Sequence, residues 1–189
     1  MISIIGGKNK KTNIEVPNKL VRPTSSRKRE SIFAVLESTS LKKNYDIYKN
    51  QYCLDLFAGS GALGLEAISR GAKFCYFFES SKEVVNILKK NCIKVCKKNN
   101  YEIIQEDLNK SNFNNILHNI SLIFIDPPYQ VNIFNNILNS LLKATLITSK
   151  TIIVIECEKN TILNLPNSMN IFNEKFYGKT RIVFINKTN

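Results

Sequence analysis

The sequence predicts one α/β domain built on a mostly parallel, seven-stranded sheet that closes with an antiparallel C-terminal hairpin. Three observations support this fold class. Apolar strand-like runs alternate with helix-like runs through the middle of the chain, which is typical of a parallel sheet. Two of the strand-like runs end in corners rich in glycine or proline, and the last two are joined at Gly178. The 189 residues suffice for one sizeable core and are few for two, so we expect a single domain over residues 1–189.

Residues 1–30 are expected to form a basic extension of that domain. Glu15 and Glu30 stand there against a larger set of basic residues, namely Lys8, Lys10, Lys11, Lys19, Arg22, Arg27, Lys28 and Arg29. The net charge of +12 and the pI near 9.5 favour a polyanionic partner such as nucleic acid. The alternative is that abundant Lys, Asn and Ile reflect an AT-rich coding sequence, which raises lysine content throughout the chain.

The remaining elements follow from apolar patterning. Continuous apolar runs of strand length predict buried strands, and apolar residues three and four apart predict helices. The expected strands cover residues 52–57, 74–78, 101–105, 121–125, 151–157, 169–176 and 180–185. The expected helices cover residues 65–70, 81–98 and 131–143, and an apolar helix-like stretch at 32–36 precedes the first strand.

The first corner joins the strand at 52–57 to the following helix through a glycine-rich turn. The residues there that we expect to contact a cofactor are Asp55, Phe57, Ala58, Gly59, Ser60 and Gly61. Glycines permit close backbone approach, and a helix N-terminus offers free N–H groups to an anionic or carboxylate group. The spacing of Gly59, Gly61 and Gly64 also matches the dinucleotide fingerprint, so an NAD-dependent oxidoreductase is an alternative, although an isolated match of this kind is weak evidence.

Acids at three strand ends discriminate between cofactors. Glu79 ends the second expected strand, where a carboxylate can accept hydrogen bonds from ribose hydroxyls, and Asp107 follows the third, where it could meet an adenine amine. Asp55 lies within the strand before the glycine turn, where it would repel a pyrophosphate and attract a sulfonium and an ammonium group. The three acids therefore favour S-adenosylmethionine over NAD. For each acid alone, a solvated strand end or a helix cap is the simpler interpretation.

The second corner is Asp126-Pro127-Pro128-Tyr129, directly after the apolar run 121–125. Open α/β sheets bind ligands at the carboxyl edge to which such a strand leads. Adjacent prolines remove two N–H donors and fix φ near about −65°, so the Asp126 carboxylate and the Pro127 carbonyl remain as acceptors before an aromatic ring. A planar group bearing an amine suits this corner. A rigid turn without function is the alternative for the tetrapeptide alone.

Several classes of protein receive little support. No apolar run is long enough for a membrane span and no secretory signal is evident, which predicts a cytoplasmic protein. The five cysteines include no C-x-x-C pair, and we expect no metal site, although Cys92 and Cys96 are one helical turn apart. His118 is the sole histidine, lies in a polar stretch, and gives no support for a Ser-His-Asp mechanism.

Taken together, the chain resembles the Rossmann-like class I S-adenosylmethionine methyltransferases, and within them the bacterial RsmD family. The resemblance covers nearly the full length. It rests on four segments, at residues 4–8 (IIGGK), 22–33 (RPTSSRKRESIF), 55–71 (DLFAGSGALGLEAISRG) and 126–129 (DPPY). The first two are specific to this family, and the last is shared with DNA amino-methyltransferases.

The resemblance implies methylation of the exocyclic N2 amine of a guanine in 16S ribosomal RNA of the small subunit. It implies that Asp55, Gly59 and Gly61 line the methionine side of S-adenosylmethionine, that Glu79 holds the ribose and Asp107 the adenine, and that the 126–129 corner receives the base. The basic residues that we expect to contact RNA are Lys8, Arg22, Thr24, Arg27 and Arg29. We expect a monomer that acts on RNA within an assembling small-subunit particle. A DNA adenine-N6 methyltransferase and a non-catalytic RNA-binding assembly factor are the alternatives.

Overall fold

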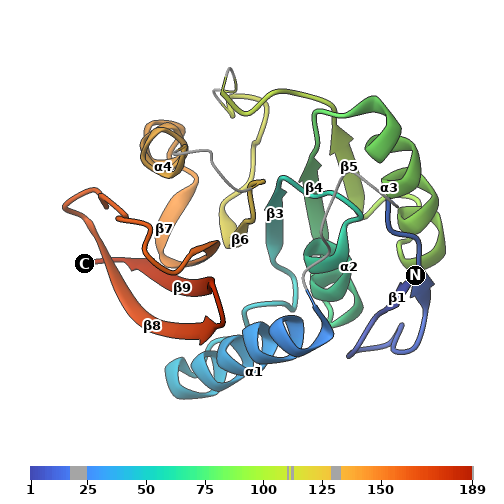
Figure 1. The fold of residues 1–189 in the computed structure, drawn as a ribbon, viewed down its shortest axis with the longest axis horizontal. Coiled ribbons are helices and arrows are strands. Elements are labelled where there is room, and N and C mark those ends of the chain that lie inside the picture. The colour runs from blue at the N-terminus through green and yellow to red at the C-terminus, as the bar shows by residue number, and fades with distance from the viewer. Residues whose placement is uncertain (18–24, 110, 112, 129–132, 189) are drawn as a thin grey trace.

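The computed structural model describes residues 1–17, 25–109, 111, 113–128 and 133–188 (Figure 1). Its strands are β1 (Ile2–Ser3), β2 (Asn13–Ile14), β3 (Tyr52–Leu56), β4 (Phe74–Phe78), β5 (Tyr101–Ile104), β6 (Ile120–Ile125), β7 (Ile147–Glu158), β8 (Met169–Tyr177) and β9 (Thr180–Lys187). Its helices are α1 (Ser26–Lys43), α2 (Ala62–Ser69), α3 (Lys82–Val95) and α4 (Phe134–Lys143).

The central sheet of the described chain has seven strands in the order β5-β4-β3-β6-β7-β9-β8. Strands β3 to β7 pair in parallel, and β9 pairs antiparallel with both β7 and β8. The predicted fold class, a mostly parallel seven-stranded sheet with a C-terminal antiparallel hairpin, is thereby confirmed. The strand order reverses between β3 and β6, which is where open α/β sheets bind their ligands.

Each face of the sheet is buried, because the parallel strands carry apolar side chains in both directions. On one face, Phe33 of α1, Leu65 of α2 and Leu88 of α3 share a core with strand residues such as Phe124. On the other face, helix α4 and the loop before β6 cover the sheet, and Phe134 and Phe113 belong to a second core there. The face under α1, α2 and α3 is the one toward which Asp55 points, since its neighbours Leu54 and Leu56 belong to the second core.

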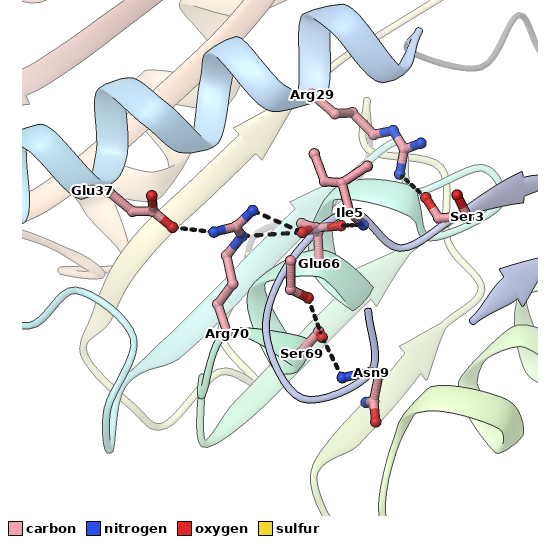
Figure 2. A network of polar contacts seen from close by, with 9 residues as sticks. Ser3, Ile5, Asn9, Arg29, Glu37, Glu66, Ser69 and Arg70 are labelled. Atoms are coloured by element: carbon pink, nitrogen blue, oxygen red, sulfur yellow. Dashed lines mark hydrogen bonds and ion pairs between the residues drawn. The ribbon is translucent and has the colours of Figure 1, made fainter. Parts of the chain in front are cut away.

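The described parts of the N-terminal extension, residues 1–17 and 25–30, are folded onto the domain. Strands β1 and β2 form a small antiparallel hairpin, and helix α1 begins at Ser26, within the range predicted for the extension. The amide of Ile5 donates to Glu66 Oε2 at 2.9 Å, and Ser69 Oγ accepts from the Asn9 amide at 2.9 Å (Figure 2). The hairpin is therefore fastened to α2.

Glycine allows this close docking at Gly7. Its φ is +72°, in the left-handed region, and a Cβ there would lie 2.0 Å from the backbone oxygen of Ser69. The glycine pair in the 4–8 segment thus has a packing reason in this structure. Across the described residues, no helix is long and apolar enough to cross a membrane.

Candidate active site at the carboxyl edge

Asp55 is buried in β3, one residue before the strand ends. Its Oδ2 accepts a hydrogen bond of 2.8 Å from the amide of Gly64, in the first turn of α2. This bond satisfies one of the free amides that begin a helix, and the negative charge suits the positive end of the helix dipole. A carboxylate has about four acceptor positions, so Asp55 retains capacity for a ligand donor beside this bond.

The turn after β3 has the strained backbone typical of a functional corner. Phe57 has a φ of 63°, which a non-glycine side chain seldom adopts. Gly59 and Gly61 follow with positive φ, and Ala58 donates its amide to the Phe78 carbonyl at 2.8 Å. Ser60 is buried, and its carbonyl accepts from the side chain of Asn91 in α3. The turn is thus fixed by both β4 and α3.

Gly64 explains why α2 approaches the sheet so closely. A Cβ there would lie 2.4 Å from the Phe77 ring and 2.7 Å from Cys75 Sγ. The third glycine of the fingerprint therefore serves helix-to-strand packing, as it does in dinucleotide folds.

Glu79 follows β4 and is half-buried beside the glycine turn. Its Oε2 accepts from the Gly59 amide at 3.0 Å, and its Oε1 accepts from the Ser81 amide at 2.8 Å. A carboxylate has about four acceptor positions, so both oxygens retain capacity for hydroxyl donors. The two amide bonds hold the carboxylate in place at the edge.

Asp107 follows β5, the strand next to β4. It is exposed, and its Oδ1 accepts 3.0 Å hydrogen bonds from the amide and the side chain of Asn109. These contacts form a local turn, which is a structural role that needs no cofactor.

The proline corner follows β6, the strand next to β3. Register pairs Asp55 with Phe124 and Leu56 with Ile125, so Asp126 comes one residue beyond the last paired row. Asp126 is half-buried, Pro127 is buried and Pro128 is exposed. Tyr129 lies outside the described residues. Asp55 and Asp126 thus flank the point where the strand order reverses.

The electrostatics of the edge favour a cation. Burial raises the pKa of Asp55 well above its ordinary value; the Gly64 hydrogen bond opposes this, while the charges of Asp126 and Glu79 raise it further. A positive group placed beside these carboxylates would relieve their repulsion, whereas a pyrophosphate would increase it. The carboxylates present therefore fit the sulfonium and ammonium of S-adenosylmethionine better than NAD.

An ion pair that sequence reasoning missed stands next to this corner. Lys28 of α1 pairs with Glu156 near the end of β7, and both side chains are largely buried. Ile155 is registered with Ile125, so Glu156 and Asp126 each follow the same paired row. The sequence carried one signal for this ion pair, because the acidic Glu156 lies within the apolar run 151–157.

The residues predicted to contact RNA divide into three groups. Lys8 and Arg27 are exposed. Arg29 is unavailable for such a contact, because its side chain is buried and its Nη1 donates to the Ser3 carbonyl at 3.1 Å (Figure 2). Arg22 and Thr24 lie outside the described residues.

The cysteines and the histidine take no part in the edge. Cys53, Cys75, Cys92 and Cys157 are buried free thiols, and the described residues contain no cluster of three His, Cys, Asp or Glu side chains suited to a metal. His118 stacks on Tyr52 with ring centroids 3.9 Å apart, and its Nδ1 lies 2.9 Å from the Tyr76 hydroxyl. Tyr52 begins β3, so this contact belongs to the opposite edge of the sheet from Asp126.

The chain is similar to known proteins over nearly its full length. A family described as "Conserved hypothetical protein 95" matches residues 2–186. A ribosomal RNA small subunit methyltransferase D of Buchnera aphidicola (subspecies Acyrthosiphon pisum) is 36% identical over 185 residues, which cover 92% of this chain and 87% of that protein. The protein of the same name from Escherichia coli is 32% identical over 183 residues, with 94% and 86% covered.

Solved structures give the same result. A putative methyltransferase from Escherichia coli superposes with a TM-score of 0.81 at 27% identity, covering 100% of this chain and 98% of that one. A putative methylase from Haemophilus influenzae gives a TM-score of 0.78 at 28% identity, covering 100% and 99%. The family match, these relatives and the acid-lined edge lead to one conclusion: the chain belongs to the RsmD family of methyltransferases.

Proposed function

We propose that this protein transfers a methyl group from S-adenosylmethionine to the N2 amine of one guanine in the 16S ribosomal RNA of the small subunit. The observation that carries the proposal is the position of Asp126 and Pro127, two acceptors just past β6, beside Asp55 at the reversal of strand order. The names of the relatives, ribosomal RNA small subunit methyltransferases, support the substrate class.

The cofactor would be held along the carboxyl edge, where β3, β4 and β5 end. Asp55, Phe57, Ala58, Gly59, Ser60 and Gly61 would take its methionine side. Glu79 would accept from the ribose hydroxyls and Asp107 from the adenine amine. When bound, S-adenosylmethionine supplies an electrophilic methyl carbon whose sulfur leaves as a neutral thioether.

The residues of the chain would orient the guanine N2 amine for attack on the methyl carbon. The lone pair of a guanine N2 amine is delocalised into the ring, so the amine must be held and turned before it can react. The Asp126 carboxylate and the Pro127 carbonyl would accept its two hydrogens, and the charge of Asp126 would stabilise the positive charge that develops on nitrogen. Asp126 is also placed to accept the proton that the nitrogen then releases. Tyr129 and Pro128 would line the site of the base, which must first leave its stack in the RNA.

The basic N-terminal residues would meet the RNA. Lys8 and Arg27 are exposed, and Arg22 and Thr24 belong to the same segment of the sequence. We propose that the protein acts as a single-domain monomer in the cytoplasm, on RNA within an assembling small-subunit particle.

The test is methyl transfer from tritiated S-adenosylmethionine to three substrates in parallel: unmethylated small-subunit particles, free small-subunit ribosomal RNA, and duplex DNA. Nucleoside analysis then identifies the labelled base. N2-methylguanosine in RNA is the expected product, and the first two substrates show whether bound proteins are required. The Asp126→Ala variant should bind the cofactor and transfer nothing.

Other outcomes would replace the proposal. Label in DNA as N6-methyladenine would make the protein a DNA methyltransferase that uses the same corner. Tight cofactor binding with no label in any substrate would make it an assembly factor without catalysis.

A further inference from the structure

A groove of about 510 Å³ runs between helix α1 and strand β8, and none of the acids of the carboxyl edge lines it. One wall is α1, with Ser31 and Thr39 among the lining residues, and the other includes Phe172 of β8. Figure 1 shows α1 passing from the β1–β2 hairpin at one end to β8 at the other. The function described above assigns no role to this groove.

The charge of the groove is of one sign. Lys42, Lys43 and Lys175 line it, all three are exposed, and no acidic residue is among its lining residues. In the described part of the chain, none of these lysines forms a salt bridge with a carboxylate. The neighbouring acid Glu174 pairs instead with Arg181. Three ammonium groups on one groove create a site for a polyanion.

Other groups in the groove suit a sugar–phosphate chain in particular. Ser31 and Ser38 contribute hydroxyls that can donate to phosphate oxygens. Asn186 adds an amide oxygen that is buried and has no hydrogen-bond partner among the described residues. A buried acceptor without a partner is costly, and a ribose hydroxyl entering the groove could donate to it. The Phe172 ring is half-buried, with Lys43 Nζ 5.9 Å from its centroid.

The groove begins beside the proposed active site. Lys175 is registered with Ile182 of β9, and Ile182 is registered with Glu156 of β7. Glu156 in turn pairs with Lys28, one helical turn before Ser31. The lining residues of α1 then extend from Ser31 to Lys43, about 18 Å at about 1.5 Å per residue. A strand lying in the groove would therefore lead toward Asp126.

From these observations we infer that the groove between α1 and β8 binds the sugar–phosphate backbone of the RNA that flanks the methylated base. This inference rests on the proposed function, because it takes ribosomal RNA as the substrate. It adds a binding surface on the side of the domain opposite the β1–β2 hairpin.

The test compares two triple variants with the same change of net charge. In the groove variant, Lys42, Lys43 and Lys175 are each replaced by Gln. In the control variant, Lys89, Lys97 and Lys98 are each replaced by Gln; all three are exposed, in or just after α3, at the far end of the sheet. The affinity of each protein for unmethylated small-subunit ribosomal RNA is measured across a salt series, with cofactor affinity and melting temperature as checks on folding.

For the groove variant, we expect the slope of log affinity against log salt to flatten by about 2, since each lost phosphate contact removes about 0.7. Its RNA affinity should fall about tenfold or more at moderate salt, while cofactor affinity stays unchanged. A third variant with Arg at the three groove positions retains the charge and should bind RNA as the wild type does. A slope equal to that of the control variant would overturn the inference.

Two further outcomes separate the groove from the function. If the wild type labels RNA but the groove and control variants bind it equally, the groove assignment fails and the proposed function stands. If the groove variant binds free RNA normally but binds the small-subunit particle weakly, the groove contacts a ribosomal protein, and the inference is again overturned. A wild type that labels no RNA in any form would refute the function itself.

Discussion

Lys28 of α1 and Glu156 of β7 form an ion pair across 128 residues of sequence, beside the row where Ile125 and Ile155 are registered. Both side chains are largely buried, and Glu156 Oε2 is buried without a hydrogen-bond partner in the described chain. The pair fastens α1 to the edge that carries Asp126. It therefore joins the proposed RNA groove to the proposed catalytic corner.

Replacing Lys28 by Met should destabilise the protein by about 3–5 kcal/mol, because the change leaves a buried carboxylate without its partner. The double variant Lys28→Met with Glu156→Leu removes both charges and should regain most of that loss. Urea unfolding of the two single variants and the double variant gives the coupling energy. The control is Lys94→Met, which breaks an exposed pair with Glu15 and should change the unfolding free energy little. Equal losses for Lys28→Met and Lys94→Met would refute the buried tether.

Gly7→Ala should loosen the docked hairpin. The substitution places a Cβ at a φ of +72° and 2.0 Å from the backbone oxygen of Ser69. Gly178→Ala is the matched control, since its φ is +58° and nothing lies within 4 Å of the added Cβ. The control should cost about 1–2 kcal/mol from backbone conformation alone, and Gly7→Ala should cost about 1–3 kcal/mol more from overpacking. Thermal unfolding measures both, and indistinguishable melting temperatures would show that the hairpin docks without need of glycine.

How far the sequence predicted the structure depended on how local each signal was. The parallel strands and both corners were predictable, because apolar runs of strand length stand directly before Asp55 and Asp126. The hairpin β1–β2 was missed, since strands of two residues are too short to show a period. The Lys28–Glu156 pair and the groove join distant segments, and only the fold brings such segments together.

The burial of Arg29 could have been predicted from its spacing in the sequence. Arg29 is spaced three, four and seven residues before Ile32, Phe33 and Leu36, which places it on the apolar face of α1. Its long side chain is buried there, with its guanidinium bonded to the hairpin at Ser3. Both Arg27 and Arg29 were predicted to contact RNA, whereas helical periodicity separates Arg29 from Arg27.

Asp126→Asn should act on transfer and not on cofactor binding. The amide keeps the shape of the side chain, but it removes the charge that would stabilise the developing positive nitrogen. We expect kcat to fall by about 10²–10³, with the dissociation constant of S-adenosylmethionine changed less than about threefold. Glu102→Gln, at an exposed position in β5, is the control and should leave both quantities unchanged. An Asp126→Asn enzyme of normal kcat would remove Asp126 from the catalytic role.

Asp55 should make both stability and cofactor binding depend on pH. Burial first, and then the charges of Asp126 and Glu79, raise its folded pKa above the ordinary value of 3.8. The folded protein therefore holds this proton more tightly than the unfolded chain does. Stability from this group is present below pH 3.8 and is lost as pH rises through the raised folded pKa. Asp55→Asn keeps an acceptor for the Gly64 amide without an ionisable proton, so its unfolding free energy should lack this loss.

Cofactor affinity should change in the opposite direction over the same window. A bound cation favours the ionised carboxylate, so binding releases the proton, and wild-type affinity for S-adenosylmethionine should rise with pH until Asp55 is ionised in the free protein. The Asn variant should bind more weakly at neutral pH and show a flatter profile. Calorimetric titration in buffers of different ionisation heat counts the protons released, and thermal unfolding of the free proteins follows stability. Parallel pH profiles for wild type and Asp55→Asn in both measurements would show that Asp55 is only a helix cap. Opposite slopes for stability and binding require that the ionised Asp55 carboxylate destabilises the free protein and is stabilised by the bound cofactor.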